Sequence, residues 1–219
     1  MKIKGIIFDM DGIITDSETA AKRIMQEILK KHQLPYSDEI YLPLLGINHY
    51  QAIEYFNSLT KNEQLSHNLL SEFSEEIITE LQQGMIPFKK GAIELINALN
   101  SINFPIALAT SAEKRKVQAS FNGNGIDVPF THVITGDMVT HSKPNPQIFL
   151  LAAQEIKQNI QDCLVIEDSY NGIRAALNAQ AIACMVPDIL EPTEEMKKQV
   201  IIKNDLFEVK KMLEELAIL

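Results

Sequence analysis

The 219-residue chain has few cysteines, few basic residues and no long apolar run. Its two cysteines, Cys163 and Cys184, lie in apolar segments, so we expect buried thiols in a protein of a reducing compartment. The apolar stretch at the N-terminus is too short for a signal peptide, and no run reaches the length of a membrane-spanning helix. We therefore expect a cytoplasmic protein that does not bind membranes.

Acidic residues outnumber basic ones, which gives the chain a net charge of -9. This balance argues against non-specific binding to nucleic acid, because such binding needs a basic face. It also means that an anionic ligand would need strong local positive charge. The rest of the composition, 46% hydrophobic and 22% charged, is typical of a globular protein with one large domain or two modest ones.

Short, almost continuously apolar segments alternate with helical patterns over much of the chain. Such segments are typical of strands that are covered on both faces of a sheet. The expected strands are residues 3–9, 105–110, 131–136, 163–168 and 182–187. The expected helices between and after them include residues 91–101, 145–156, 171–180 and 206–216. This alternation predicts an α/β fold with a doubly wound parallel sheet.

Residues 17–86 interrupt the alternation, because only helical patterns occur there. An apolar stripe runs from Ala21 to Leu29 with helical spacing, and residues 49–59 and 69–83 indicate further helices. We therefore expect a helical cap over residues 16–87, inserted into an α/β core formed by residues 1–15 and 88–219.

Acidic side chains follow two of the expected strands. Asp9 and Asp11 belong to the segment FDMDGIITDSE, and Glu167 and Asp168 follow the segment CLVI. Because ligands of open α/β sheets bind at the carboxyl ends of the strands, we expect these acids to meet at one edge. Hard oxygen ligands of this kind, present in small number, suit Mg²⁺. The alternatives are a solvated Asp- and Gly-rich turn at the first pair and helix capping by Asp168 or Ser169 at the second.

Two further residues point to an anion at the same edge. Thr110 ends the strand PIALAT, where its hydroxyl and the free N–H groups of the next helix could hold a phosphate. Alternatively, Thr110 and Glu113 form a capping box. Lys143, in the segment HSKPNPQIF, would neutralise crowded carboxylates and an anion, although a lysine in a loop is more often solvated.

Together these segments resemble the four ordered motifs of the haloacid dehalogenase superfamily. The resemblance covers nearly the whole chain, and the inserted helices resemble the cap of the subgroup with β-phosphoglucomutase and the phosphoglycolate phosphatases. It implies a Rossmann-like core and an aspartyl-phosphate mechanism. Asp9 would be the nucleophile, and Asp11 would protonate the leaving group and then deprotonate water. Phosphate oxygens would be held by Thr110, Ser111 and Lys143.

The resemblance also implies a cofactor and a class of substrate. Mg²⁺ would bind Asp9, the Asp11 carbonyl, Glu167 and Asp168. A cap of this size encloses a small site, so we expect a small phosphate ester such as a sugar phosphate. Possible polar contacts to the substrate are Glu18, Thr19, Asn48, His49, Lys114 and Arg115.

The superfamily contains both phosphatases and mutases, and the sequence favours a phosphatase. Ala21 stands where the mutase has a histidine, and His49 stands where it has an arginine. No lysine or arginine lies between Lys61 and Lys89, where the mutase uses a cap lysine. These differences remove the groups that would hold a second phosphate. A β-phosphoglucomutase-type activity stays as the alternative.

A more distant alternative is a non-enzymatic receiver module in which a partner phosphorylates Asp9. Receivers are also doubly wound sheets with acids at the strand ends and a lysine. The inserted cap and Asp11 argue against this alternative, because a stable phospho-switch needs neither. For the oligomeric state, members of the resembled subgroup suggest a monomer or a dimer.

Overall fold

The computed structural model describes residues 2–45, 47 and 49–219. Its centre is a parallel sheet with the strand order β3-β2-β1-β4-β5-β6. The strands are β1 Gly5–Phe8, β2 Ile106–Ala109, β3 His132–Ile134, β4 Cys163–Glu167, β5 Ile182–Met185 and β6 Ile201–Ile202. The order runs outward from β1 in one direction and from β4 in the other, so the chain reverses its winding between these two neighbours. The predicted doubly wound parallel sheet is thereby confirmed.

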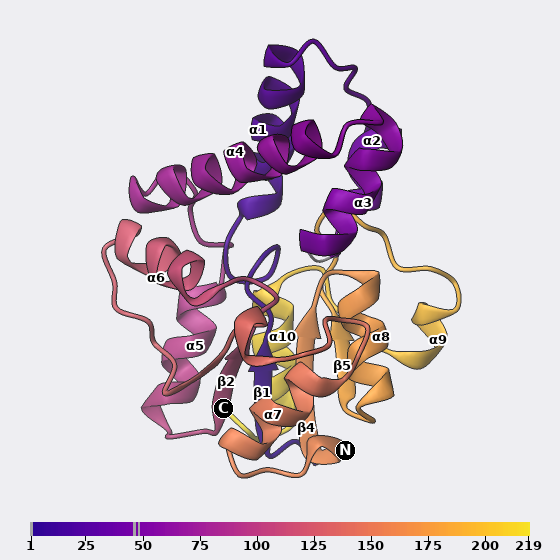
Figure 1. The fold of residues 1–219 in the computed structure, drawn as a ribbon. Helices are drawn as coiled ribbons and strands as arrows, with labels where there is room; N and C mark the ends of the chain where they lie inside the picture. Colours follow the sequence, from indigo (N-terminus) through magenta and orange to yellow (C-terminus); the bar gives the residue numbers. More distant parts are fainter. Residues whose placement is uncertain (1, 46, 48) are drawn as a thin grey trace.

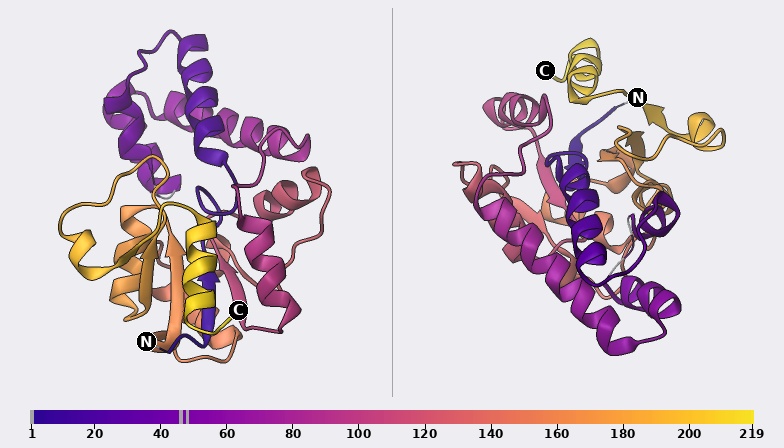
Figure 2. Two further views of the ribbon diagram at one scale, coloured as in Figure 1. Left: turned by 180° about the vertical axis from the view of Figure 1, so that it is seen from behind. Right: turned by 90° about the horizontal axis from the view of Figure 1, so that it is seen from above.

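Helices cover both faces of the sheet (Figures 1 and 2). One apolar cluster joins β1, β2 and β4 to α5 (Ala92–Ser101), α6 (Lys114–Gly123) and α10 (Leu206–Glu215). A second cluster joins the opposite face to α7 (Gln147–Glu155), α8 (Tyr170–Asn178) and α9 (Met196–Gln199). Strand residues alternate between the clusters, with Ile6 and Phe8 in the first and Ile7 in the second. The sheet domain also contains the short 3₁₀ turns η2 Gly136–Met138 and η3 Ile160–Asp162. A further 3₁₀ turn, η1 Leu42–Leu44, lies in the cap.

The five expected strands are all present, each shorter than its apolar run, but the expectations missed β6. This strand has two residues and pairs Ile201 with Cys184 of β5. A strand of this length cannot show an apolar run. Its formation depends on pairing with the edge of β5 rather than on its own sequence pattern.

The helices described between Ser17 and Gln82 lie above the carboxyl ends of the strands (Figure 1). They are α1 Ser17–Lys31, α2 Asp38–Tyr41, α3 His49–Thr60 and α4 Glu63–Gln82, together with η1. Among the described residues of this insertion no strand occurs, as expected. Helix α4 begins six residues earlier than its apolar pattern suggested, because Asn62 caps it by accepting a bond from the N–H of Leu65 at 3.1 Å.

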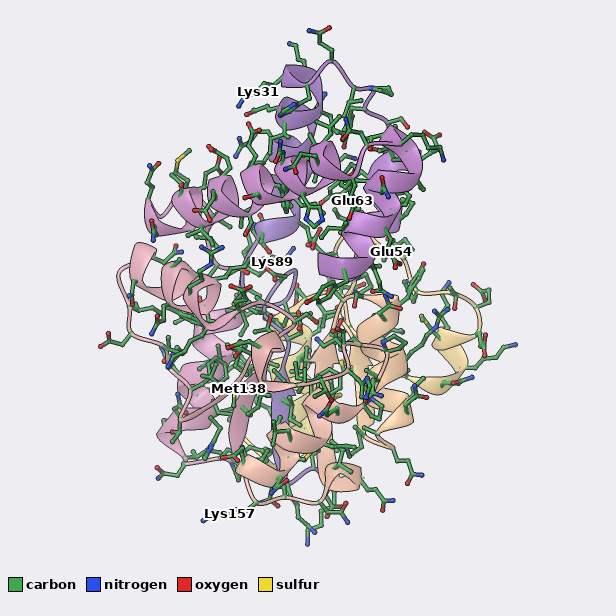
Figure 3. All side chains as sticks on the ribbon, viewed as in Figure 1. Lys31, Glu54, Glu63, Lys89, Met138 and Lys157 are labelled. Atoms are coloured by element: carbon green, nitrogen blue, oxygen red, sulfur yellow. The ribbon has the colours of Figure 1, made fainter. Side chains whose placement is uncertain are left out.

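The insertion has its own apolar core, and two antiparallel chain segments connect it to the sheet domain. Thr15 bridges to Phe88, and the N–H of Asp16 donates to the carbonyl of Pro87 at 2.9 Å. Lys89 lies at this junction (Figure 3), where its Nζ is 2.6 Å from Asp188 Oδ1. Below the junction, α4 packs against α6, and Ala119 of α6 belongs to the apolar core of the cap. No helix in the described part of the chain is long and apolar enough to cross a membrane.

Candidate active site

The strand-end acids meet where the sheet reverses its winding. Phe8 of β1 pairs with Ile166 of β4, so the next residues on each strand, Asp9 and Glu167, lie side by side. The N–H of Asp9 donates to the carbonyl of Ile166 at 3.0 Å, which fixes its backbone to β4. Both acidic side chains are buried. Such carboxylates need compensating charge, because burial disfavours their ionised form.

Lys143 supplies that charge from the loop before α7. Its Nζ donates to Asp9 Oδ1 at 2.5 Å and to Glu167 Oε1 at 2.7 Å, and only 5% of the residue is exposed. The ammonium also lies 4.9 Å from the centre of the Phe149 ring. Burial alone would lower the pKa of Lys143, but Asp9 and then Glu167 outweigh this effect and raise it above its ordinary value. The lysine is therefore a buried cation, and the solvated alternative is wrong.

The Glu167 carboxylate is held firmly by its own loop. Its Oε2 accepts bonds from the N–H groups of Asp168 and Ser169 at 2.9 and 2.8 Å and from Ser169 Oγ at 3.0 Å. A Cβ at Gly172 would lie 1.7 Å from Glu167 Oε1, so only glycine fits at that position. Ser169 also caps α8 by accepting a bond from the N–H of Gly172 at 3.0 Å. The expected capping role of Ser169 is thus confirmed.

Three carboxylates form a cluster that fits a divalent cation. One oxygen from each of Asp9, Glu167 and Asp168 lies within 4.8 Å of the others. Hard oxygen donors in this number suit Mg²⁺, which completes its shell with waters or with a ligand phosphate. In the described part of the chain the Asp168 carboxylate has no hydrogen-bond donor, so its oxygens are available for a cation. The chemistry of this donor set therefore fits the expected metal.

The electrostatics show the same need for positive charge. Burial raises the pKa of Asp9 to about 7, with Lys143 opposing the rise and Glu167 adding to it. Burial and the neighbouring Glu167 and Asp9 raise the pKa of Asp168 well above its usual range. A cation in the cluster acts in the opposite direction, because a nearby positive charge favours carboxylates in their ionised form.

Asp11 stands apart from this cluster. Its Oδ1 accepts a bond from Ser17 Oγ at 2.6 Å, and Lys116 Nζ lies 2.9 Å from Oδ1 and 2.8 Å from Oδ2. Burial alone would raise the pKa of Asp11, but Lys116 and then Ser17 hold it below its ordinary value. The chain turns between the two aspartates at Gly12, whose φ is +76°. The turn explains why residues two apart reach different partners.

Thr110 and Ser111 follow β2 at the same edge. Thr110 is buried, and its Oγ1 accepts a bond from the N–H of Ala112 at 3.0 Å. The alternative of a capping box is wrong, because α6 begins at Lys114 with Glu113 in the cap position and no side-chain cap bond. The hydroxyl of Thr110 thus stays at the strand end and orders the turn that presents Ser111.

A cavity of about 880 Å³ lies between this edge and the cap. Its floor contains Asp9, Asp11, Thr110, Ser111, Lys143, Glu167 and Asp168. Its roof is largely apolar and includes Met25, Leu70, Phe73 and Ile77 from α1 and α4. A space of this size suits a small molecule rather than a polymer.

The residues expected to contact a substrate have different positions, and Thr19 among them is exposed and does not line the cavity. Glu18 lines the cavity and accepts a bond from the Tyr41 hydroxyl at 3.1 Å, and burial, followed by the charge of Asp11, raises its pKa to about 7. The side chain of His49 and residue Asn48 lie outside the described residues. Lys114 is exposed and is not part of the cavity wall, whereas Arg115 and Lys116 are.

Sequence reasoning missed Ser17 and Lys116 as functional candidates. In the sequence, Ser17 only marks the start of the expected helical insertion. Lys116 belongs to the basic run Lys114–Lys116, and nothing in that run shows which side chain turns toward Asp11. Only the orientation of α6 decides this, and it depends on the burial of Val117 and Phe121 beneath the helix.

Comparison with known proteins agrees with this geometry. The model of the family described as haloacid dehalogenase-like hydrolase matches residues 6–186. YhcW of Bacillus subtilis, named as a phosphatase, is 29% identical over 187 residues, which are 85% of this chain and 84% of that protein. Fructose-1-phosphate phosphatase YqaB of Escherichia coli is 30% identical over 174 residues, covering 78% of this chain and 90% of that protein.

Solved structures show the same fold. The β-phosphoglucomutase of Clostridium difficile superimposes with a TM-score of 0.78 at 20% identity, covering 99% of this chain and 100% of that one. The predicted family is therefore confirmed: the chain belongs to the haloacid dehalogenase-like hydrolases and is a phosphohydrolase of that family.

Proposed function

We propose that this protein is a Mg²⁺-dependent phosphatase that hydrolyses a small phosphorylated metabolite, with a sugar phosphate as the expected class, through an aspartyl-phosphate at Asp9. The observation that carries the proposal is the contact between Asp9 Oδ1 and Lys143 Nζ, 2.5 Å apart, on the floor of the cavity beneath the cap. A carboxylate is a weak nucleophile toward an anionic phosphate. Positive charge beside both groups is therefore what the reaction needs most.

In the first step, a carboxylate oxygen of Asp9 attacks phosphorus and forms the acyl phosphate, while the bond from phosphorus to the ester oxygen breaks. Asp11 gives its proton to that oxygen, so the leaving group departs as an alcohol. Lys143 offsets the charge on the transferring group. Thr110 and the N–H of Ser111 would hold phosphate oxygens. Phosphoryl transfer depends mainly on such positioning and charge stabilisation.

In the second step, water hydrolyses the acyl phosphate. Asp11, now a carboxylate, takes a proton from the water as its oxygen attacks phosphorus, and Asp9 leaves as a carboxylate. The product is inorganic phosphate. Lys116 and Ser17 contact Asp11 in its ionised form, which is the form this second step requires.

The metal site would be formed by Asp9, the Asp11 carbonyl, Glu167 and Asp168. When bound, Mg²⁺ neutralises charge on the phosphate and brings it to the nucleophile. The chain itself contributes the orientation of the ligands. The loop N–H groups fix Glu167, while the Asp168 carboxylate stays available.

Charge in the cap favours a phosphatase over a mutase. The cap contains Lys22, Arg23, Lys30, Lys31 and Lys61, and none of the five lines the cavity. Lys22, Arg23 and Lys31 instead form ion pairs with acids of the cap itself. Among the described roof residues there is therefore no fixed cation for a second phosphate. A leaving group that carries hydroxyls fits this roof better than one that carries a second phosphate. A relative, fructose-1-phosphate phosphatase, is named for such an ester.

The cap also supplies the candidate contacts for the hydroxyls of the leaving group. Glu18, together with the hydroxyl of Tyr41, faces the cavity. We keep His49, at the start of α3, as a further candidate, but not Lys114, which is exposed and does not line the cavity.

The test is phosphate release from a panel of small phosphorylated metabolites, with Mg²⁺ and with EDTA, for wild type and Asp9→Asn. The proposal predicts metal-dependent release that disappears in the variant. Conversion of β-glucose 1-phosphate to glucose 6-phosphate with little free phosphate would support the mutase. No release from any substrate, with Asp9 still labelled by a small phosphodonor, would support the receiver module.

A further inference from the structure

Lys116 lies beside the carboxylate that would exchange protons in the proposed mechanism. It is the third residue of α6, a helix anchored by the buried side chains of Val117 and Phe121. Its Nζ contacts both oxygens of Asp11, at 2.9 and 2.8 Å, and its side chain is 25% exposed at the cavity wall. The packing of α6 therefore fixes the direction in which the Lys116 ammonium reaches the Asp11 carboxylate.

Two elements of the chain share the carboxylate of Asp11. Ser17, the first residue of the cap helix α1, donates to Oδ1 at 2.6 Å. Lys116 approaches from the sheet domain and touches both oxygens. The two contacts fix the carboxylate from different sides. Without these contacts, an aspartate before a glycine turn would lose this orientation and sample several rotamers.

The surroundings of Lys116 argue against a purely structural ion pair. Both partners are about one-quarter exposed, and an ion pair with this exposure contributes little to stability because solvent screens it. Glu18 also faces Lys116 within the cavity, so acids surround the ammonium on more than one side. The ion pair therefore matters more for where it places the Asp11 carboxylate than for the stability of the fold. Asp11 is the group that must exchange protons with the ester oxygen and with water.

We propose that Lys116 is a positioning residue for Asp11, which it holds together with Ser17 in the orientation needed to take a proton from water in the second half-reaction. This inference rests on the proposed function. Lys116 does not touch the reacting atoms and acts only through Asp11. Removing it therefore slows the reaction where Asp11 is present and changes nothing where Asp11 has already been disabled.

A double-mutant cycle tests this directly. The four proteins are wild type, Lys116→Met, Asp11→Asn and the double variant, assayed with Mg²⁺ on the best substrate of the panel and at raised enzyme concentration for the slow variants. Methionine keeps the apolar stem and removes the charge. Lys210→Met is the matched control: Lys210 also pairs with a carboxylate, Glu214, at 2.9 Å, but on α10 and away from the cavity.

The expected result is a loss of about tenfold or more in kcat for Lys116→Met, because well-placed general acids and bases contribute about 10²–10⁴-fold. KM stays within about twofold, since no substrate contact is removed. In the Asp11→Asn background the same substitution changes kcat by less than about twofold. Lys116→Arg restores most of the activity, because arginine can also contact both carboxylate oxygens.

Three results would overturn the inference. One is an equal loss of kcat in both backgrounds, which would show that Lys116 acts independently of Asp11. Another is a raised KM with unchanged kcat, which would make Lys116 a substrate contact. The third is failure of Lys116→Arg to recover activity although it folds. Absence of phosphate release by wild type would instead refute the proposed function, and with it this role.

Discussion

Lys143 Nζ lies 2.5 Å from Asp9 Oδ1 and 2.7 Å from Glu167 Oε1, so one buried ammonium connects the ends of the two central strands. The two carboxylates belong to neighbouring strands, and the lysine comes from a loop well over a hundred residues after the first of them. The contact therefore joins Asp9, the cluster of carboxylates and their counter-charge in one network.

Lys143→Met should abolish activity and destabilise the metal-free protein. Removing one partner of a buried ion pair leaves carboxylates without compensation, at a cost of about 3–5 kcal/mol in the free energy of unfolding. Because Mg²⁺ would replace part of the lost charge, the variant should gain more in Tm from added Mg²⁺ than wild type does. Thermal unfolding with and without Mg²⁺ measures both effects. Equal gains in Tm for both proteins would contradict the network.

Gly12→Ala should remove metal-dependent activity. A Cβ at Gly12 would lie 2.2 Å from Asp168 Oδ2, so the carboxylate must move away from the cluster. Gly125→Ala is the matched control, because its φ of +75° is nearly that of Gly12 at +76°, while nothing lies within 4 Å of its added Cβ. Both substitutions should cost about 1 kcal/mol of stability from the left-handed backbone. Only Gly12→Ala should weaken Mg²⁺ binding, measured by calorimetry; equal binding by the two variants would refute the prediction.

Glu18→Gln should flatten the pH dependence of stability. Burial raises the pKa of Glu18 from 4.5 to about 7, so between these values the folded protein holds a proton that the unfolded chain has lost. Stability contributed by this group is complete below pH 4.5 and is lost as the pH rises toward 7. The charged or titratable groups that face Glu18 are Asp11, Lys116, Tyr41 and Asp188.

Urea unfolding of the metal-free protein at a series of pH values measures this effect. Between pH 4.5 and 7, the free energy of unfolding should fall more steeply with pH in wild type than in Glu18→Gln. The difference in slope should be on the order of 1 kcal/mol per pH unit. Superimposable curves would show that Glu18 is ordinarily ionised in the folded protein.

Gly123→Ala should disturb the contact between cap and sheet domain. A Cβ there would lie 1.7 Å from the carbonyl oxygen of Leu81, so α4 and α6 could not keep their present approach. We expect a loss of about 2 kcal/mol or more in the free energy of unfolding, as for overpacked cores. Activity should fall as well, because α4 lines the cavity. Denaturant unfolding and steady-state kinetics are the measurements, and wild-type values in both would contradict the close approach.

The sequence predicted the sheet because five strands buried on both faces produce short, almost continuously apolar segments, whereas the helices between them show apolar residues at helical spacing. It predicted the floor of the site for a related reason. Residues at the carboxyl ends of such strands, as Asp9, Thr110 and Glu167 are, lie at one edge of the sheet regardless of the loop conformations. The two-residue strand β6 escaped, because its pairing depends on β5 and not on its own pattern.

What could not be predicted depends on helix orientation. Lys114 and Lys116 are two residues apart in one basic run, yet one is exposed and the other contacts Asp11. The capping box of Thr110 and Glu113 had a suitable spacing, but α6 starts three residues later than that pattern requires. Both outcomes follow from how α6 packs on the sheet and on the cap, which local sequence does not determine.

The central claim is that Asp9 carries the phosphoryl group, and the direct measurement is mass spectrometry of acid-quenched enzyme after mixing with substrate and Mg²⁺. We expect one added phosphoryl group on the peptide that contains Asp9, removable by hydroxylamine and absent from Asp9→Asn, which should also release no phosphate. Undiminished phosphate release by Asp9→Asn, with no label on that peptide in wild type, would contradict it.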